Sequence, residues 1–226
     1  MAEPSATPSP TVLIVDDHDL VGTALAHGLR AEGLAGRYAR AVDVGGVLGE
    51  ADQLPVGLAL LDLDLGRDRT GRRLDGVDLV APLTARGWRC IVLSGTVDRA
   101  RVGAALAAGA LAAVSKHAPF PVLLTKVRAA LAGAPVMTPE ARRQLIDSHR
   151  TQESERRTIE DRLERLTRRE REVLAELAQG HRAQAVADRS VVSLATVRTQ
   201  IRSVLTKLEV GSQLEAVALY RRARSG

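Results

Sequence analysis

The sequence predicts a doubly wound α/β domain with a five-stranded parallel sheet, followed by an all-α domain of four helices. Two patterns predict the first domain: short apolar runs typical of buried strands, and helical periodicity in the segments between them. A third pattern predicts the second domain, because three helix-start signals follow one another after residue 162. We therefore expect an α/β domain over residues 11–133, a charged helical linker over 134–161 and a helical domain over 162–226.

Two of the predicted strands end in carboxylates. Residues 58–61 form an apolar run that leads directly into Asp62, and residues 12–15 lead in the same way into Asp16 and Asp17. An uninterrupted apolar run is typical of a strand that is buried on both faces of a parallel sheet. A carboxylate at the C-terminal end of such a strand lies where open α/β folds bind ligands, although a single Asp there can also simply cap the following turn.

Two further strands end in other polar groups. Residues 90–93 lead into Ser94, and residues 111–115 lead into Lys116. Because the C-terminal ends of parallel strands lie at one edge of the sheet, we expect this hydroxyl and this amine beside the three carboxylates. The sequence thus predicts a single site to which four strands contribute.

This set of side chains suits phosphoryl transfer. Clustered carboxylates repel one another unless a cation neutralises them, and Mg²⁺ prefers a few carboxylates together with waters and a phosphate oxygen. Asp62 would then be the nucleophile that accepts a phosphoryl group. Ser94 would hydrogen-bond one phosphoryl oxygen, and Lys116 would pair with another.

These residues resemble the receiver domain of two-component response regulators, in which an acid pair, a phosphoacceptor Asp, a Ser or Thr and a Lys occur in this order. The resemblance covers residues 11–133. It implies a flavodoxin-like fold in which a sensor histidine kinase phosphorylates Asp62, and Ser94 and Lys116 bind the phosphoryl group as switch residues. It also implies a Mg²⁺ ion held by Asp16, Asp17, Asp62 and the backbone carbonyl of Asp64.

A second family shares part of this pattern. Asp62-Leu63-Asp64 also matches the DxD signature of haloacid-dehalogenase-type phosphatases, which likewise use a later Ser or Thr and a Lys. Those enzymes carry the DxD on an early strand and place their metal-binding acid pair last. Here the acid pair comes first, which favours the receiver and a protein whose only chemistry is phosphorylation and dephosphorylation of Asp62.

Three departures from the receiver pattern leave a further alternative, a regulator that binds DNA without being phosphorylated. Gly66 replaces a usual proline, and the arginine-rich loop 67–73 is longer than usual. This loop is either a solvated insertion or a contact for the phosphoryl group or the kinase. At the position of Ala113, receivers normally have an aromatic side chain that moves inward when the Ser or Thr moves toward the phosphoryl group. This chain lacks that aromatic residue, which argues against the usual mechanism that couples phosphorylation to the rest of the protein.

Helical periodicity and capping residues predict the helices between the strands. Pro82 lies inside one of them and should kink or shorten it. A weaker strand is expected over residues 36–39. The expected helices cover residues 19–31, 42–50, 76–86, 98–108 and 122–132.

Composition and charge limit the function. The net charge of +5 is concentrated near the C-terminus, since residues 162–226 carry 13 basic and 7 acidic side chains while residues 1–133 carry 14 of each. This distribution indicates that the C-terminal domain binds a polyanion. The single cysteine, Cys90, lies in an apolar strand, which is typical of a core residue in a reducing compartment. No apolar run is long enough to span a membrane, and we expect a cytoplasmic protein.

The linker is strongly charged from Arg142 to Arg165. Its few apolar positions leave a gap of twelve polar residues, which is too large for a stable coiled coil. We therefore expect an exposed helix or a flexible connector.

The C-terminal domain has the pattern of a helix-turn-helix. Thr167 with Glu170 and Ser212 with Glu215 form capping boxes, and Ser193 can cap the helix between them. That helix follows a short one over residues 183–189 and has a polar, basic outer face, as a recognition helix needs to enter the major groove. The expected DNA-contacting residues are Thr196, Arg198, Thr199, Gln200, Arg202 and Lys207.

Residues 166–174, 196–200 and 207–210 also resemble the DNA-binding domain of LuxR/NarL-type regulators. Departures occur at residues 183–185, at Gln200 in place of the usual His and at Glu209 in place of the usual Gly. The resemblance implies a transcription regulator that binds promoter DNA. Because one helix-turn-helix reads only a few base pairs, we expect a homodimer on DNA.

Overall fold

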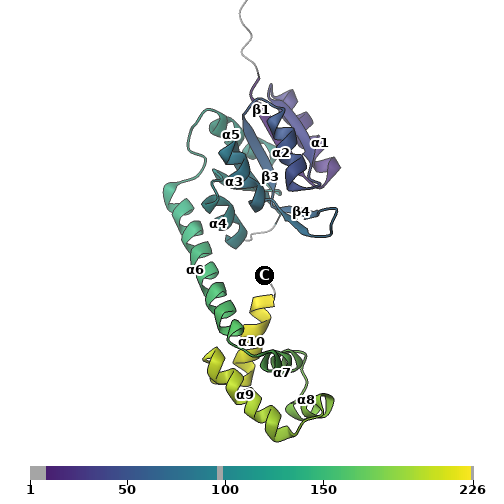
Figure 1. Cartoon of the computed structure of the whole chain (residues 1–226). Coiled ribbons are helices and arrows are strands. Elements are labelled where there is room, and N and C mark those ends of the chain that lie inside the picture. The colour runs from purple at the N-terminus through teal and green to yellow at the C-terminus, as the bar shows by residue number, and fades with distance from the viewer. Residues whose placement is uncertain (1–8, 96–98, 225–226) are drawn as a thin grey trace, which may run out of the picture. The chain divides into compact units, whose positions relative to one another are not determined.

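The computed structural model describes residues 9–95 and 99–224, and the chain divides into two compact units between residues 150 and 151 (Figure 1). The elements follow in this order: β1 (Thr11–Asp16), α1 (Asp19–Ala31), β2 (Ala35–Arg40), α2 (Val44–Asp52), β3 (Leu58–Asp62), β4 (Asp64–Arg67), β5 (Arg73–Asp75), α3 (Val77–Ala85), β6 (Arg89–Ser94), α4 (Arg99–Ala107), β7 (Ala112–Ser115), α5 (Phe120–Leu131), α6 (Pro139–Glu164), α7 (Arg168–Ala178), α8 (Ala183–Ser190), α9 (Leu194–Leu208) and α10 (Gln213–Arg224).

The first unit contains the predicted five-stranded parallel sheet, with the strand order β2-β1-β3-β6-β7. The strand order changes direction between β1 and β3, so the sheet is doubly wound. The crevice at such a change of direction is where open α/β sheets bind ligands. Asp16 ends β1 and Asp62 ends β3, so both carboxylates lie at this crevice.

The strand residues alternate between two apolar cores, one on each face of the sheet. On β1, Val12 and Ile14 pack with α1 and α5, whereas Leu13 and Val15 pack with α2, α3 and α4. The strands β3 and β6 follow the same alternation. Both faces of the sheet are therefore buried, which explains why these strands are continuous apolar runs.

The predicted helices are confirmed with shifts at their ends. α2 begins at Val44, later than expected, because the side chain of Asp43 caps it by accepting a hydrogen bond from the Gly46 amide at 2.7 Å. α3 accommodates Pro82 and is nine residues long. Asp98, the expected first residue of the next helix, lies outside the described residues.

The segment after β3 is an antiparallel hairpin, β4–β5, where the sequence predicted only a long loop. Gly66 has φ +70° and Gly71 has φ +83°, conformations that favour glycine. A proline, whose φ is fixed near about −65°, cannot adopt the conformation of Gly66, which explains the departure from the receiver pattern. Gly76 allows the chain to pass close to β3, since a Cβ there would lie 1.9 Å from the Asp62 carbonyl oxygen.

The predicted linker forms a helix, α6, of 26 residues without a buried side chain. Its first turns pack on the first unit, where Leu145 and Ile146 cover part of the core of α2, α3 and α4. Its last turns belong to the second unit, where Leu163 packs on the helical core. Ion pairs of Glu153 with Arg156 and Arg157, spaced three and four residues apart, support the exposed middle.

The second unit is a bundle of α7, α8, α9 and α10 around one apolar core. The predicted capping box of Thr167 and Glu170 is confirmed, and the side chain of Ser193 accepts a hydrogen bond from the Thr196 amide. Glu209, which replaces a usual glycine, has φ +58° at the end of α9. Its carboxylate pairs with Arg162 at 2.9 Å and Arg165 at 3.0 Å, and these contacts help to hold an unfavourable backbone conformation.

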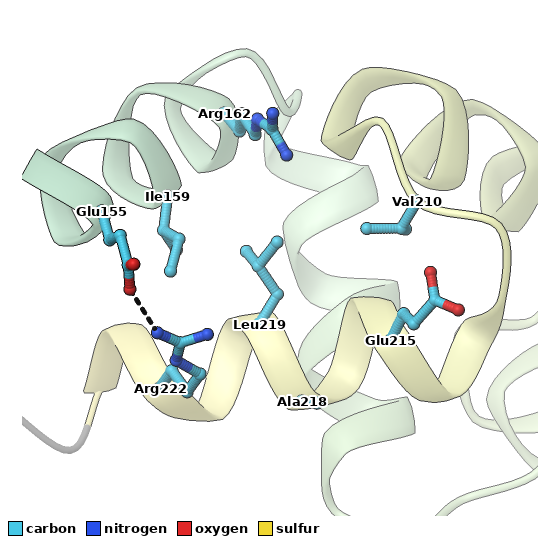
Figure 2. Close-up of a pocket in the computed structure, with 8 residues that line it drawn as sticks. All are labelled: Glu155, Ile159, Arg162, Val210, Glu215, Ala218, Leu219 and Arg222. Carbon is cyan, nitrogen blue, oxygen red and sulfur yellow. Dashed lines mark hydrogen bonds and ion pairs between the residues drawn. The ribbon is translucent and has the colours of Figure 1, made fainter. Parts of the chain in front are cut away.

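A groove of about 450 Å³ lies between α10 and the last turns of α6 (Figure 2). Ile159 and Leu219 face it, and Arg222 pairs with Glu155 across it at 3.1 Å. Within the described part of the chain, no helix is both long enough and apolar enough to cross a membrane.

Candidate functional site

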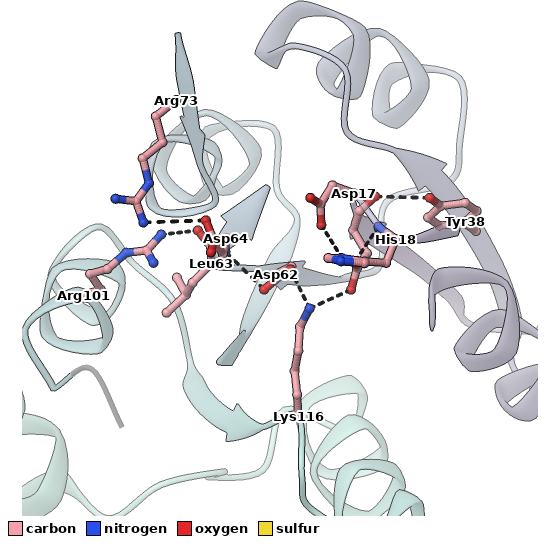
Figure 3. Close-up of polar contacts among 10 residues, drawn as sticks. Asp17, His18, Tyr38, Asp62, Leu63, Asp64, Arg73, Arg101 and Lys116 are labelled. Atoms are coloured by element: carbon pink, nitrogen blue, oxygen red, sulfur yellow. Dashed lines mark hydrogen bonds and ion pairs between the residues drawn. The ribbon is translucent and has the colours of Figure 1, made fainter. Parts of the chain in front are cut away.

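Four side chains at the crevice between β1 and β3 converge on one point. Asp16, Asp17, His18 and Asp62 each place one ligand atom within 4.8 Å of the others (Figure 3). Asp16 and Asp62 are buried, with 0% and 2% of their surface exposed. The apolar strands that carry them hold these carboxylates away from water, which makes a nearby cation favourable.

Lys116, just beyond the C-terminal end of β7, is one such cation. Its ammonium lies 2.5 Å from Oδ2 of Asp62 and 3.1 Å from Oδ2 of Asp16. Burial raises the pKa of Asp62, and the hydrogen bonds from Lys116 and from the Asp64 amide only partly offset this effect. Burial also opposes the charge of Lys116, but its hydrogen bonds to the two carboxylates outweigh burial and raise its pKa.

A cavity of about 240 Å³ opens beside these groups and is lined by Asp17, Asp62, Ser94 and Lys116. The structure thus brings together the side chains that the sequence placed at four strand ends. The side chain of Asp64 is mostly exposed and lies 3.6 Å from Arg73, while its amide donates to Oδ1 of Asp62 at 3.1 Å. The backbone amide of Asp64, and not its side chain, is therefore directed toward the Asp62 carboxylate.

The sequence interpretation missed two residues at this site. His18 lies 2.6 Å from Asp17, and the attraction of that carboxylate raises the pKa of the imidazole. Its position directly after the acid pair was a signal that could have identified it. Arg101 lines the cavity from α4. No local pattern marks this arginine, because its contacts form only when α4 packs beside the hairpin.

The donor set fits a divalent cation. Three carboxylates face the ammonium of Lys116, and Arg101, a second cation at the cavity, is paired with Asp75. The three carboxylates and Lys116 thus carry a net charge of −2 when His18 is neutral. Carboxylate oxygens are the ligands that Mg²⁺ prefers, with water or phosphate oxygens completing its shell. Asp16, Asp17 and Asp62 would hold the ion.

The outer face of α9 carries most of the residues expected to contact DNA. Thr196, Arg198, Thr199 and Arg202 are exposed on this helix. Gln200 is half-buried, so it is less accessible than the sequence suggested.

Lys207 differs from the expectation. Its ammonium lies 2.7 Å from Glu170, a carboxylate at the start of α7 that is only 7% exposed. The lysine is thus part of an internal ion pair that joins α7 to α9, and its charge is directed into the domain.

A doubly wound sheet with an acidic crevice, followed by a helix-turn-helix bundle, defines the class of two-domain DNA-binding regulators. Comparison with known families agrees with this class. Residues 12–128 match the response regulator receiver domain, and residues 164–220 match the bacterial regulatory proteins of the luxR family. The chain belongs to the transcriptional response regulators of two-component systems that carry a LuxR-type DNA-binding domain. The match of residues 12–128 is to the receiver domain, which is the family that the order of the acidic residues favoured over the DxD-type phosphatases.

Full-length relatives support the assignment. The nitrate/nitrite response regulator protein NarP of Escherichia coli (strain K12) is 31% identical over 98% of both chains. The transcriptional activator protein ExaE of Pseudomonas putida is 33% identical over 92% of this chain and 94% of its own length.

Solved structures show the same fold. The RcsB response regulator of Salmonella typhimurium covers 95% of this chain and 99% of its own, with a TM-score of 0.51 and 21% identity. A structure of two RcsB dimers bound to two parallel DNAs has a TM-score of 0.50 and 24% identity, and covers 95% of this chain and 98% of its own.

Proposed function

We propose that Asp62 accepts a phosphoryl group from a sensor histidine kinase in the cytoplasm, in a reaction that requires Mg²⁺. The observation that carries this proposal is the burial of Asp62 between Lys116 and the acid pair, at the mouth of a cavity large enough for a phosphoryl group. The reaction is the one that the receiver family carries out, and the residues are assigned to their roles from the geometry of this chain.

Each side chain has a distinct task in this reaction. A carboxylate oxygen of Asp62 attacks phosphorus, and the bond from phosphorus to the donor's leaving group breaks. Lys116 neutralises a phosphoryl oxygen, and Ser94 hydrogen-bonds another. Asp16, Asp17 and Asp62, together with the backbone carbonyl of Asp64, would hold Mg²⁺, which would supply neutralising charge during the transfer.

The first test uses acetyl phosphate with Mg²⁺ and measures intact mass. The wild-type protein should gain one phosphoryl group, and Asp62→Asn should gain none because the amide is not a nucleophile. Asp64→Asn is the matched control and should be modified normally, since its side chain is exposed and paired with Arg73. Equal labelling of Asp62→Asn would contradict the assignment, and an unlabelled wild type would favour the regulator that works without phosphorylation.

The output of this chemistry is DNA binding. We propose that Thr196, Arg198, Thr199, Gln200 and Arg202 contact promoter DNA and that the protein binds as a homodimer. Four of these side chains are exposed on α9, whose N-terminus is capped by the side chain of Ser193. A dimeric state on DNA is the arrangement named for RcsB, whose fold this chain shares. Lys207 supports the domain from inside and is not proposed as a DNA contact.

A further inference from the structure

Arg101 reaches from α4 to the residue beside Asp62. Its guanidinium donates a hydrogen bond to the backbone oxygen of Leu63 (Figure 3). It also pairs with Asp75, with one nitrogen 2.9 Å from a carboxylate oxygen. Arg101 also lines the same cavity as Asp62 and Lys116. A second cation besides Lys116 therefore borders the space that a phosphoryl group on Asp62 would enter.

Arg101 can give up its hydrogen bond to the Leu63 oxygen without leaving that oxygen unpaired. The Leu63 oxygen also accepts a hydrogen bond from the Gly76 amide at 3.1 Å, so it keeps a partner when the arginine departs. A phosphoryl oxygen is charged, and arginine forms short, charge-assisted and often bidentate hydrogen bonds with phosphate oxygens, which favours the exchange. The nitrogen that contacts Leu63, Nη2, also pairs with Asp75, while Nε makes a second hydrogen bond to Asp75 at 3.2 Å. Because a guanidinium has several donors in a fixed fork, Arg101 can turn Nη2 to the phosphoryl group and keep Asp75 through Nε.

α4 is in turn packed tightly against the first turns of α6. A Cβ on Gly103 would lie 2.3 Å from the Leu145 carbonyl oxygen, so the two helices approach closely at this point. Arg142 adds hydrogen bonds to the carbonyl oxygens of Leu106 at 2.7 Å and Ala110 at 2.6 Å. Close-packed elements transmit displacements because they have no free space to absorb them.

We propose that Arg101 binds the phosphoryl group on Asp62 and thereby shifts α4 against α6, in place of the aromatic residue that Ala113 lacks. This inference rests on the proposed phosphorylation of Asp62. In the unmodified protein the guanidinium is held by Leu63 and Asp75. After phosphorylation one nitrogen exchanges the Leu63 oxygen for a phosphoryl oxygen, α4 follows its side chain, and residues 139–150 of α6 respond.

Hydrogen exchange of the full chain, followed by mass spectrometry, tests the proposal. Wild type, Arg101→Gln and Arg99→Gln are compared before and after treatment with acetyl phosphate and Mg²⁺. Phosphorylation of the wild type should change amide exchange in residues 139–150, and Arg101→Gln should take up the phosphoryl group but lose that change. Arg99 is an exposed arginine on the same helix, so Arg99→Gln should respond as the wild type does.

Several outcomes would overturn the proposal. An Arg101→Gln variant that responds in α6 as the wild type does would remove Arg101 from the coupling. A variant that takes up no phosphoryl group would assign Arg101 to the transfer reaction instead. If Arg101→Gln fails to fold, Arg101→Lys is used instead, because it keeps the positive charge but lacks the several donors of a guanidinium. Phosphorylation of Arg101→Lys should change amide exchange in residues 139–150 less than in the wild type, and an undiminished change would contradict the proposal. A wild type without phosphoryl uptake would instead contradict the proposed function itself, and this inference with it.

Discussion

At the scale of single residues, the sequence predicted those side chains whose position follows from a strand. Asp62 follows an apolar run, and the C-terminal ends of the buried strands lie at the ligand-binding edge of a doubly wound sheet. Lys207 is a different case, since helical periodicity placed it on the outer side of α9 while the structure pairs it with Glu170 of α7. Such a pair depends on how two helices pack, and periodicity within one helix does not contain that information.

Replacing Lys207 therefore tests stability more than DNA contact. Lys207→Ala leaves the Glu170 carboxylate buried and without its ammonium partner, which should lower the free energy of unfolding of the C-terminal domain by about 2 kcal/mol. Arg198→Ala, on the exposed face of the same helix, should change stability by less than about 0.5 kcal/mol and weaken specific DNA binding by about 1–3 kcal/mol. Hydrogen exchange of α9 amides and DNA titrations measure the two effects. If Lys207→Ala kept normal stability and its DNA affinity depended less on salt, the result would show that Lys207 contacts a DNA phosphate after all.

The same ion pair predicts a dependence on pH. Burial raises the pKa of Glu170, but hydrogen bonds from Lys207, Ser203 and Thr167 outweigh burial and lower the pKa to about 2 from a usual 4.5. Because the pKa is lower in the folded state, the stabilisation is complete above the unfolded value and is lost as pH falls from about 4.5 toward 2.

Exchange of α9 amides measured between neutral and acidic pH should thus accelerate on acidification, and Glu170→Gln should flatten this response. Glu172→Gln is the control, since that carboxylate is exposed and pairs only with surface arginines. Equal flattening by both variants would show that general charge, and not the buried pair, sets the pH dependence.

At the scale of elements, the strands and most helices were predictable because period and capping are local properties. The hairpin β4–β5 was not, because its strands are short and their pairing depends on two glycines with positive φ. Gly66 joins this hairpin to the site, since a Cβ there would lie 2.9 Å from Oδ2 of Asp17. Gly66, which in the sequence was only a departure from the receiver pattern, is thus required both by its positive φ and by its closeness to Asp17.

Substituting the two glycines separates these effects. Gly66→Ala should lower the free energy of unfolding by about 1–2 kcal/mol through its positive φ, and should also weaken Mg²⁺ binding because Asp17 must move. Gly71→Ala has a similar φ and no atom within 4 Å of the new Cβ, so it should cost stability without affecting Mg²⁺. Trp88, the single tryptophan, lies in the core of the first unit, and its fluorescence reports the unfolding of that unit. Equal Mg²⁺ affinity in both variants would contradict the link between the hairpin and Asp17.

At the scale of the whole molecule, the distribution of charge along the sequence separated the two functions. The first 133 residues balance their charges, and the cavity beside Asp62 is lined by both carboxylates and cations, as suits the proposed site for a phosphoryl group and Mg²⁺. The basic excess after residue 162 suits a DNA-binding surface. The sequence also indicated that the linker lacks a continuous apolar seam. What the sequence could not supply was the proposed route from Asp62 to the linker. The contacts of Arg101 with Leu63, of Gly103 with Leu145 and of Arg142 with Leu106 form only in the folded domain.

The last prediction concerns the number of copies on DNA. One recognition helix contacts only a few base pairs, so useful specificity requires two copies on adjacent half-sites. Because a gap of twelve polar residues interrupts any apolar seam in the linker, we expect the receiver domain and α10 to hold the dimer, with phosphorylation shifting a pre-existing equilibrium. Selection from random DNA should yield inverted repeats whose half-site centres lie about 10–11 base pairs apart, and sedimentation should show two chains per duplex. Inserting about 5 base pairs between the half-sites turns one of them to the opposite side of the DNA helix and should abolish cooperative binding. Selection of single, unrepeated sites that are each bound by one chain would contradict the dimer.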